Sequence, residues 1–442
     1  MNALPRPLPQ PAADRDLIVD RLPNGLTVAS CRMPALRTAS VAAFVGVGVR
    51  DEPLRLNGLS HMIEHMVFKG TAHRDARELS MVIERAGASM NAYTGKEVTV
   101  YHVDAVPAAL PVAVEALADV VLRPAFPDHE IVRERKVIAQ EIDEASDDPE
   151  SLAQDACDAL AFPGQALGRP ILGTRRHLAA IGRDELIAHH ARHYRADNVM
   201  LVAAGQIDHS RWAADVATHF RFDARAEART RTAGPPAARE AARYASGFRH
   251  VDDDFGSTDV LIAWPAASRR SPEFAHWELL AELLGGGASS PLFQSIREEQ
   301  GLAYRVECWL DGYEDAGLLR IAAGVRPSNV GRFLDGTCRT LLRLAESIPD
   351  EEMTRTRNQK LMTIAQRHER PMDVAEALAD DLWVHGRART FEETIATMRA
   401  VDAATLRATL RGMLASKPTL TVVGRMRLAD PMTVLRRRLG TP

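Results

Sequence analysis

The sequence predicts an α+β fold of two homologous domains, each a mostly antiparallel sheet with helices packed on one face. Three observations lead to this prediction. The chain has 442 residues, which is more than a single hydrophobic core usually serves. Residues 224–245 are poor in large apolar side chains and contain Gly234-Pro235-Pro236, as a linker would. The stretches before and after this linker, residues 17–223 and 246–442, resemble each other in sequence.

In the first half, the pattern of apolar side chains predicts three elements that matter below. Residues 40–49 are rich in β-branched and apolar side chains, which suits a buried strand. Residues 57–68 have apolar side chains at helical spacing, and Asn57 or Ser60 could cap that helix. Residues 126–141 begin with proline and aspartate, which are helix entry signals, and continue with helical spacing.

The second half repeats this order of elements. Three pairs of segments share their residue pattern: 40–49 with 259–264, 83–93 with 296–304, and 126–130 with 348–352. The copies differ in residues that could bind a metal. Opposite His61, Glu64 and His65 stand Trp277, Leu280 and Ala281, and opposite Glu134 and Glu141 stand Thr356 and Thr363. The asymmetry predicts one active half and one degenerate half.

Composition and charge argue against several classes of protein. The net charge is −4 and acidic residues are interleaved with the arginines, so no nucleic-acid partner is expected. The apolar run at residues 39–49 is far shorter than the roughly 20 residues that a membrane-spanning helix needs. Residues 1–16 lack the apolar core of a signal peptide, so we expect a cytoplasmic protein, or a periplasmic one if a signal peptide has been removed. Cysteines occur at four widely spaced positions and are expected to be buried thiols: Cys31, Cys157, Cys308 and Cys338.

The segment His61-Met62-Ile63-Glu64-His65 predicts a zinc site on the first of these helices. His61 and His65 are four residues apart and therefore lie on one face, one turn apart, where both can bind one ion. Glu64 lies about 100° around the helix from His65 and could reach a water on the metal as a general base. The order H-x-x-E-H is the signature of inverted zinc peptidases. The apolar neighbours of these residues make unpaired polar groups costly, and a metal site would explain them.

Two further sets of residues bear on this site. His189 and His193 have the same spacing, but they stand beside Arg192 in a strongly polar segment, so we expect a solvated helix face there. A third zinc ligand should come from another helix. Glu134 and Glu141 are candidates because residues seven apart lie on one helix face, although without a metal both would be ordinary surface glutamates.

Together these motifs resemble the pitrilysin family of zinc metallopeptidases (family M16), in its mitochondrial-processing-peptidase-like two-domain branch (M16B). The resemblance extends over nearly the whole chain from about Val19. Three sets of residues carry it: His61, Glu64 and His65 with Glu134 and Glu141; Asn91-Ala92-Tyr93-Thr94 with residues 97–101; and Arg297 with Tyr304.

The resemblance implies one Zn²⁺ per chain in a catalytic domain at residues 17–223, with residues 246–442 as a domain without metal ligands. The implied roles are these: His61, His65 and Glu141 as zinc ligands, Glu64 as general base, Glu134 as an outer carboxylate that orients a ligand imidazole, Asn91 beside the substrate on an edge strand, and Arg297 and Tyr304 as contacts to the substrate backbone. Full-length pitrilysins join four such domains. A two-domain chain is therefore expected to form its chamber as a homodimer, or as a heterodimer with a related M16 subunit.

Taken without the family resemblance, the residues predict that Arg297 pairs with Glu298 or Glu299 at the surface and that Tyr304 packs in a strand. Gly301 between them would instead allow a turn that aims both side chains at one point.

The function predicted from these residues is that of a zinc-dependent metalloendopeptidase, which binds extended peptides or unfolded polypeptides at a sheet edge inside a chamber. The alternative is a non-catalytic structural M16-like subunit that has lost its metal, and the complete set of metal-binding residues argues against it. A dinucleotide-binding enzyme is disfavoured because Gly46-Val47-Gly48 and Gly285-Gly286-Gly287 lack the G-x-G-x-x-G pattern.

Overall fold

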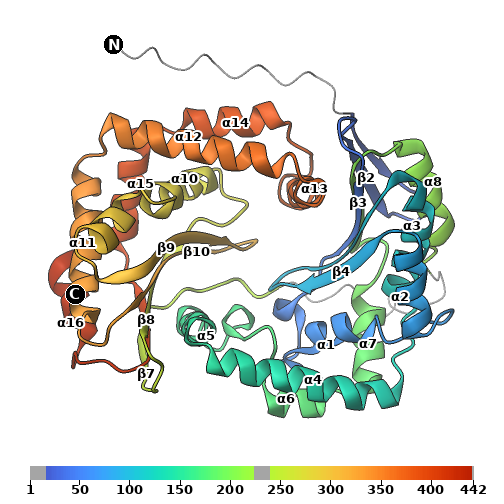
Figure 1. The fold of residues 1–442 in the computed structure, drawn as a ribbon, viewed down its shortest axis with the longest axis horizontal. Helices are drawn as coiled ribbons and strands as arrows, with labels where there is room; N and C mark the ends of the chain where they lie inside the picture. Colours follow the sequence, from blue (N-terminus) through green and yellow to red (C-terminus); the bar gives the residue numbers. More distant parts are fainter. Residues whose placement is uncertain (1–15, 223–238, 441–442) are drawn as a thin grey trace.

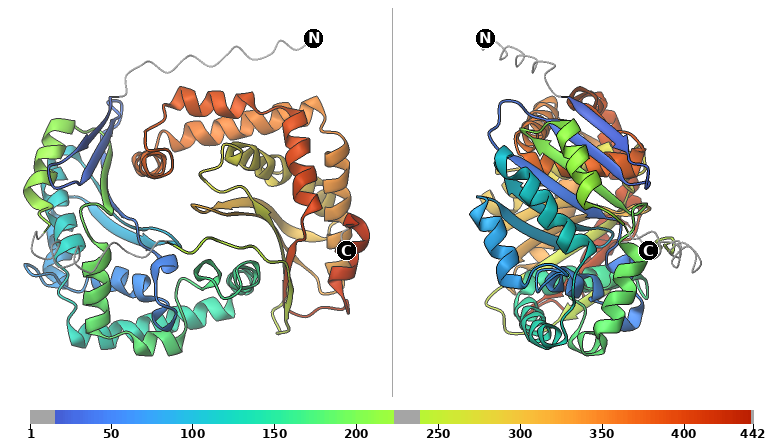
Figure 2. Two further views of the ribbon diagram at one scale, coloured as in Figure 1. Left: turned by 180° about the vertical axis from the view of Figure 1, so that it is seen from behind. Right: turned by 90° about the vertical axis from the view of Figure 1, so that its right-hand side faces the viewer.

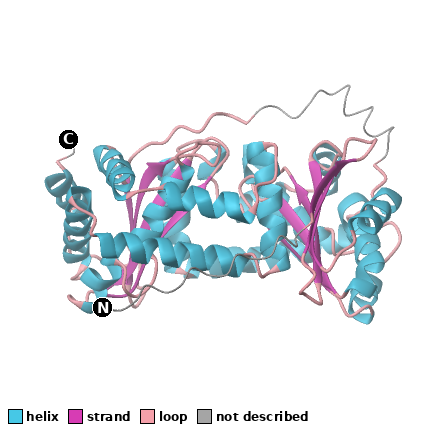
Figure 3. Cartoon of the chain, turned by 90° about the horizontal axis from the view of Figure 1, so that it is seen from above, coloured by secondary structure: helices cyan, strands magenta, loops and turns pink. Residues whose placement is uncertain are grey.

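The computed structural model describes residues 16–222 and 239–440. It contains two sheets with helices, one sheet in each half of the chain (Figure 1). Of the expected linker at 224–245, residues 224–238 lie outside the described residues, and residues 239–245 form neither helix nor strand. Seen from above, the two sheets stand apart, with helices between them and on their outer sides (Figure 3).

The first sheet has six strands in the order β1-β2-β6-β3-β5-β4. The β2–β6 pair is parallel and the other pairs are antiparallel, so the sheet is mostly antiparallel as predicted. The strand bounds are β1 Leu17–Arg21, β2 Thr27–Arg32, β3 Ala39–Val45, β4 Ser89–Thr94, β5 Thr99–Ala105 and β6 Val199–Gly205. At one edge lies β4, which pairs only with β5 within the described sheet.

The second sheet repeats this topology without a counterpart of β1. Its order is β7-β11-β8-β10-β9, and its one parallel pair, β11–β7, stands where β2–β6 stands in the first sheet. The strand bounds are β7 Phe248–Val251, β8 Thr258–Ala266, β9 Ala303–Gly312, β10 Gly317–Val325 and β11 Thr419–Val423. The internal repeat predicted from the sequence is therefore present in the strand order.

The helices follow the same repeat. In the first half they are η1 Val49–Asp51, η2 Leu54–Leu56, α1 Leu59–Met66, α2 Ala76–Arg85, η3 Pro107–Ala109, α3 Leu110–Leu122, α4 Asp128–Asp147, α5 Pro149–Ala161, η4 Ala166–Gly168, α6 Arg175–Ala180, α7 Arg183–His193 and α8 His209–His219. In the second half they are α10 Phe274–Gly285, the π-helical η5 Phe293–Glu298, α11 Val330–Glu346, α12 Asp350–Arg367, α13 Pro371–His385, α14 Phe391–Ala400, α15 Ala403–Ala415 and α16 Pro431–Leu439.

The main core of the first half lies between one face of its sheet and helices of the same half. Val41, Ala43 and Val45 of β3 are fully buried there with Leu117 and Val121 of α3. Alternate residues of a strand point to opposite faces of the sheet. The β3 residues between these three therefore point to the other face, where a second layer of side chains is needed to bury them. All seven residues of β3 are buried, which means that this second cover exists.

One helix of each half covers the inner face of the other half's sheet. Helix α13 packs on β2, β3 and β6, and α5 packs on β7, β8 and β11. Val374 and Leu378 of α13 are buried with Phe44 of the first sheet, while Cys157 of α5 is buried with Leu261 of the second. Figure 1 labels both helices beside the opposite sheet, and Figure 2 shows the same placement from behind. Because each sheet is completed by the other half, the two halves form one folded body.

Charged groups join the two halves where their edge hairpins meet. Glu97, in the turn between β4 and β5, is buried and accepts hydrogen bonds from Arg50 (2.6 Å) and Arg269 (2.7 Å). It also accepts one from the backbone N–H of Glu314 in the turn between β9 and β10 (2.9 Å), and Arg50 donates to Asp315 of that turn (2.7 Å). Buried charges are costly unless they are paired, so these contacts hold the two turns together.

Two further properties of the described chain concern its cysteines and its helices. None of the four cysteines forms a disulfide; three are buried and Cys308 is half-buried. None of the helices in the described ranges combines the length and the apolar character that crossing a membrane requires.

Candidate metal centre

Helix α1 is held at its N-terminus by a carboxylate that precedes the usual capping positions in the sequence. The Glu52 side chain accepts hydrogen bonds from the backbone N–H groups of Gly58 (2.8 Å) and Ser60 (2.7 Å), and the Asn57 amide also donates to it (3.1 Å). Burial raises the pKa of Glu52 to about 7. The expectation that Asn57 or Ser60 caps this helix is therefore wrong. A buried carboxylate takes that role because the free N–H groups and the dipole of a helix N-terminus favour an anion.

Three candidate ligands converge from α1 and α4, which pack against each other. Glu141 Oε2 lies 3.7 Å from His61 Nε2 and 3.6 Å from His65 Nε2. One ligand atom from each of the three residues lies within 4.8 Å of the others. Ligand atoms about 2.0 Å from a tetrahedral zinc ion are separated by roughly 3.3 Å. The cluster therefore has the size that a single zinc ion needs.

The state of His61 also fits a metal ligand. Its side chain is buried, and in the described part of the chain neither ring nitrogen has a hydrogen-bond partner. Burial, with a smaller effect of the neighbouring His65, lowers the pKa of His61 to about 4. The ring is thus neutral at pH 7, which is the form that binds a metal, and its approach to Glu141 is not an ion pair. Burying an imidazole without a hydrogen bond is costly, and a bound cation would offset that cost.

Glu134 lies where it can orient the second imidazole. It is 4% exposed, and its Oε2 lies 3.0 Å from His65 Nδ1. If Nδ1 carries the proton and donates it to Glu134, Nε2 keeps its lone pair facing Glu141. Lys69 Nζ lies 2.8 Å from the other oxygen of Glu134 and balances its charge. Our sequence reasoning missed Lys69, which lies three residues beyond the end of α1, where helical spacing does not indicate the direction of a side chain.

Glu64 is not one of the three clustered ligands, but it stands beside them on α1. Its carboxylate is half-buried, and burial raises its pKa above the usual value. The Thr94 hydroxyl at the end of β4 donates a hydrogen bond of 2.6 Å to Glu64 Oε2. A polar group of the edge strand thus contacts the candidate base directly.

Asn91 lies on the same edge strand and is exposed. Its Oδ1 accepts a hydrogen bond of 2.9 Å from the backbone N–H of Ala92. Alternation along β4 places Asn91 and Tyr93 on one face and Ala92 and Thr94 on the other. Asn91 is therefore near the free edge but on the face opposite to Thr94.

Arg297 and Tyr304 are brought together within the second half. Gly301, with φ +59°, provides the expected turn between them. The Arg297 guanidinium lies 4.6 Å from the centroid of the Tyr304 ring and 4.7 Å from that of Phe293, and it also lies 3.5 Å from a Glu298 oxygen. Tyr304 is 83% exposed, so it is not packed in its strand. These contacts all lie in the second half, and none joins the pair to the metal cluster in the described chain.

The second histidine pair is buried, which corrects the expectation of a solvated helix face. His189 is 6% exposed and His193 is 4% exposed, because they share a face of α7 with Leu186. Helix α7 packs against α1, and His189 Nε2 lies 3.5 Å from the Ser60 hydroxyl. Burial lowers the pKa of His193 to about 4, so its ring is neutral. The segment is polar overall, so its composition did not indicate that one face of the helix is buried.

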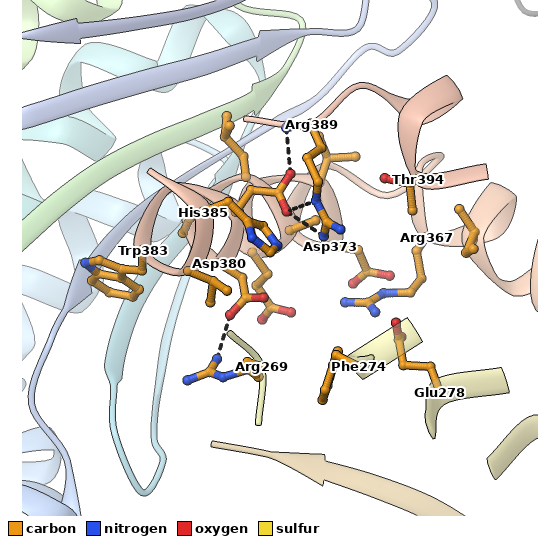
Figure 4. A pocket seen from close by; sticks show the side chains of 18 of the residues that line it. Arg269, Phe274, Glu278, Arg367, Asp373, Asp380, Trp383, His385, Arg389 and Thr394 are labelled. Carbon is orange, nitrogen blue, oxygen red and sulfur yellow. Dashed lines mark hydrogen bonds and ion pairs between the residues drawn. The ribbon is translucent and has the colours of Figure 1, made fainter. Parts of the chain in front are cut away.

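A cavity of about 1360 Å³ lies between the first sheet and helices α10, α12, α13 and α14. Charged and aromatic side chains line it, among them Arg367, Asp373 and Trp383 (Figure 4). Tyr93 of β4 also lines it, and its hydroxyl donates to Glu376 of α13 (2.9 Å). Since Thr94 contacts Glu64 from the opposite face of the strand, β4 has the metal cluster on one side and the cavity on the other.

Two family models and several named proteins match this chain. A family model described as insulinase (peptidase family M16) matches residues 27–175, and one described as the peptidase M16 inactive domain matches residues 180–360. A protein of Rickettsia bellii (strain RML369-C), named an uncharacterized zinc protease, is 31% identical over 92% of this chain and 97% of its own. A protein of Arabidopsis thaliana, named a probable mitochondrial-processing peptidase subunit beta, is 30% identical over 88% of this chain and 74% of its own.

A solved structure described as the peptidase M16 inactive domain from Pseudomonas fluorescens has the same fold. Its TM-score is 0.84 at 18% identity, covering 94% of this chain and 100% of the other.

Proposed function

This chain belongs to peptidase family M16, and we propose that it is a zinc-dependent metalloendopeptidase that hydrolyses peptides or unfolded polypeptides held in a chamber. The observation that carries this proposal is the convergence of His61, His65 and Glu141 from two helices, with Glu64 beside them. We assign one zinc ion per chain to the three converging residues. Residues 17–223 would form the catalytic domain, and residues 246–442 the domain without metal ligands.

The residues of the site suit hydrolysis of an amide. Bound zinc would polarise a peptide carbonyl and lower the pKa of a water molecule. One oxygen of Glu64 accepts a hydrogen bond from the Thr94 hydroxyl. The other oxygen would accept a proton from the attacking water and return it to the leaving amine. The raised pKa of Glu64, caused by burial, brings this carboxyl closer to the pH at which proton transfer is efficient. Glu134 would keep the His65 ring in place through its Nδ1.

The free edge of β4 would bind the substrate. An extended peptide can pair with such an edge through backbone hydrogen bonds, which require no particular sequence. Asn91 would lie beside it, and the cavity on the other side of β4 has room for several side chains. This mode of binding suits unfolded polypeptides, because folded proteins have few extended segments free to pair.

The second candidate is a structural subunit without activity. The relatives named above include a processing-peptidase subunit as well as a zinc protease, so both roles need to be tested. Metal analysis of the purified chain, followed by digestion of a peptide library, separates them. About one zinc per chain together with chelator-sensitive cleavage supports the peptidase. A chain that binds no zinc and cleaves nothing in the library is a structural subunit.

We expect the active form to be a dimer. One chain offers two domains, and a chamber closed on all sides needs a second chain. Because this chain carries both the metal cluster and the Arg297–Tyr304 pair, a homodimer is the first choice, and a heterodimer with a related M16 subunit is the other. Sedimentation of the active protein is expected to give twice the mass of the chain. A monomer with full activity would contradict both forms of this prediction.

Arg297 and Tyr304 are expected to act on the substrate from the second half. Both can donate hydrogen bonds to a peptide carbonyl, and the contact of the guanidinium with the Tyr304 ring holds the two side chains beside each other. Loss of one such donor typically costs about 10²–10³ in turnover. We predict that Tyr304→Phe and Arg297→Ala keep the fold and the zinc but lower peptide cleavage at least tenfold.

The matched control for this pair is Arg339→Ala. Arg339 lies on α11 of the same half, and in the part of the chain that the structure describes it pairs only with Asp335 one turn away. Its removal should leave cleavage unchanged. If Tyr304→Phe and Arg297→Ala both cleave as well as the control variant, the pair is an ordinary surface contact.

A further inference from the structure

The edge strand and the candidate base are connected by a single hydrogen bond. Thr94 is the last residue of β4, and its hydroxyl donates to Glu64 Oε2 at 2.6 Å. In the described chain no other side chain donates a hydrogen bond to this carboxylate. The orientation of Glu64 therefore depends on Thr94. From this contact we propose that Thr94 is a positioning residue, which couples the strand that binds the peptide to the carboxylate that accepts the proton. The inference rests on the proposed function.

A glutamate needs such a contact because its side chain has many rotamers. Fixing a long, flexible side chain costs conformational entropy, so a half-buried glutamate without a partner samples several positions. The Thr94 hydroxyl engages one oxygen and leaves the other free. Threonine is suited to this role because its branched Cβ restricts χ1 and keeps the hydroxyl in a defined direction.

The strand that carries Thr94 is itself held at the face opposite to Glu64 and at its end. Tyr93, the preceding residue, donates to Glu376 of α13 from the second half. Three residues after Thr94, Glu97 is fixed by Arg50 and Arg269. A shift of the hydroxyl would therefore require movement of a strand anchored in both halves. Because Thr94 belongs to this strand, the orientation of the Glu64 carboxylate depends on the strand at whose edge the peptide would bind.

Thr94→Val is the variant that tests this role, because valine keeps the branched shape and the strand propensity and removes only the hydroxyl. A misplaced catalytic group can cost about 100-fold in rate. We expect kcat to fall about 10–100-fold with KM changed less than about threefold. Zinc content should stay at the wild-type value. Thr94→Ser, which restores a hydroxyl, should recover most of kcat.

Thr99→Val is the matched control. Thr99 is the direct cross-strand partner of Thr94 in β5, and its hydroxyl donates to the backbone carbonyl of Val47 (2.9 Å) instead of to Glu64. This variant removes the same group from the same hairpin. It should lower stability without changing kcat by more than about twofold.

A crystal structure of zinc-loaded Thr94→Val provides a readout that does not depend on turnover. We expect the Glu64 carboxylate to be displaced or to occupy more than one rotamer, while His61, His65 and Glu141 are unmoved. A wild-type kcat in Thr94→Val, or an equal loss of kcat in Thr94→Val and Thr99→Val, would overturn the assignment. Failure of the proposed function would be recognised separately, since the wild-type protein would then cleave no peptide.

Discussion

Glu64→Gln is expected to abolish peptide cleavage while the protein keeps its zinc. The amide has the same shape as the carboxylate and can still accept the hydrogen bond from Thr94, but it cannot accept a proton. General-base catalysis typically contributes about 10²–10⁴ in rate, so kcat/KM should fall by at least that range. The measurement is cleavage of a peptide found in the library digestion, with zinc determined on the same sample.

Two results would contradict the role given to Glu64. An active Glu64→Gln enzyme would exclude this residue as the base. Loss of zinc in the variant would show instead that Glu64 is a ligand or supports one, which disagrees with its place outside the three-ligand cluster. Because Glu64 lies on the same helix as both histidines, circular dichroism should also verify that α1 and the fold are retained.

His61→Ala and Glu141→Ala are expected to lose zinc and cleavage together. Either change leaves two protein ligands, and a catalytic zinc site usually has three. Zinc bound per chain after dialysis should therefore fall from about one to near zero, and cleavage should fall to background. Glu134→Gln should have a smaller effect, because it keeps all three ligands and changes only the partner of His65. The expected loss is about 10–100-fold in zinc affinity.

The matched control on the same helix is Glu144→Ala. Glu144 is exposed on α4, and within the described residues its side chain forms a hydrogen bond only with the Gln140 side chain one turn earlier. Its removal should change neither zinc content nor cleavage. If Glu141→Ala retains zinc as fully as this control does, the third ligand lies elsewhere and the proposed metal centre is incorrect.

Local spacing was sufficient to find the candidate ligands. His61 and His65 lie four apart and Glu134 and Glu141 seven apart, and these distances along a helix determine which side chains share a face. The repeated pattern of the two halves likewise predicted two sheets of the same topology, because alternation and helical spacing are short-range properties of each segment. The residues of the site could therefore be listed from the sequence, and their roles followed from the family that they resemble.

What the spacing could not show is which surfaces meet. Helices α5 and α13 each cover the sheet of the other half. The residue pattern of either helix does not indicate on which of the two similar sheets it packs. The same limit explains the cap on α1 by Glu52 and the burial of His189 and His193. In each case polar residues are buried in contacts that helical spacing within one segment does not predict.

The sequence by itself thus determined the family, the fold class and the candidate metal-binding side chains, because short-range patterns and the family resemblance they carry indicate them. The tertiary structure alone decided how α1 docks on α4 and how the hydroxyl of Thr94 meets Glu64. These contacts depend on side chains brought together from far apart in the chain, and their free energies come from burial and pairing that exist only after folding.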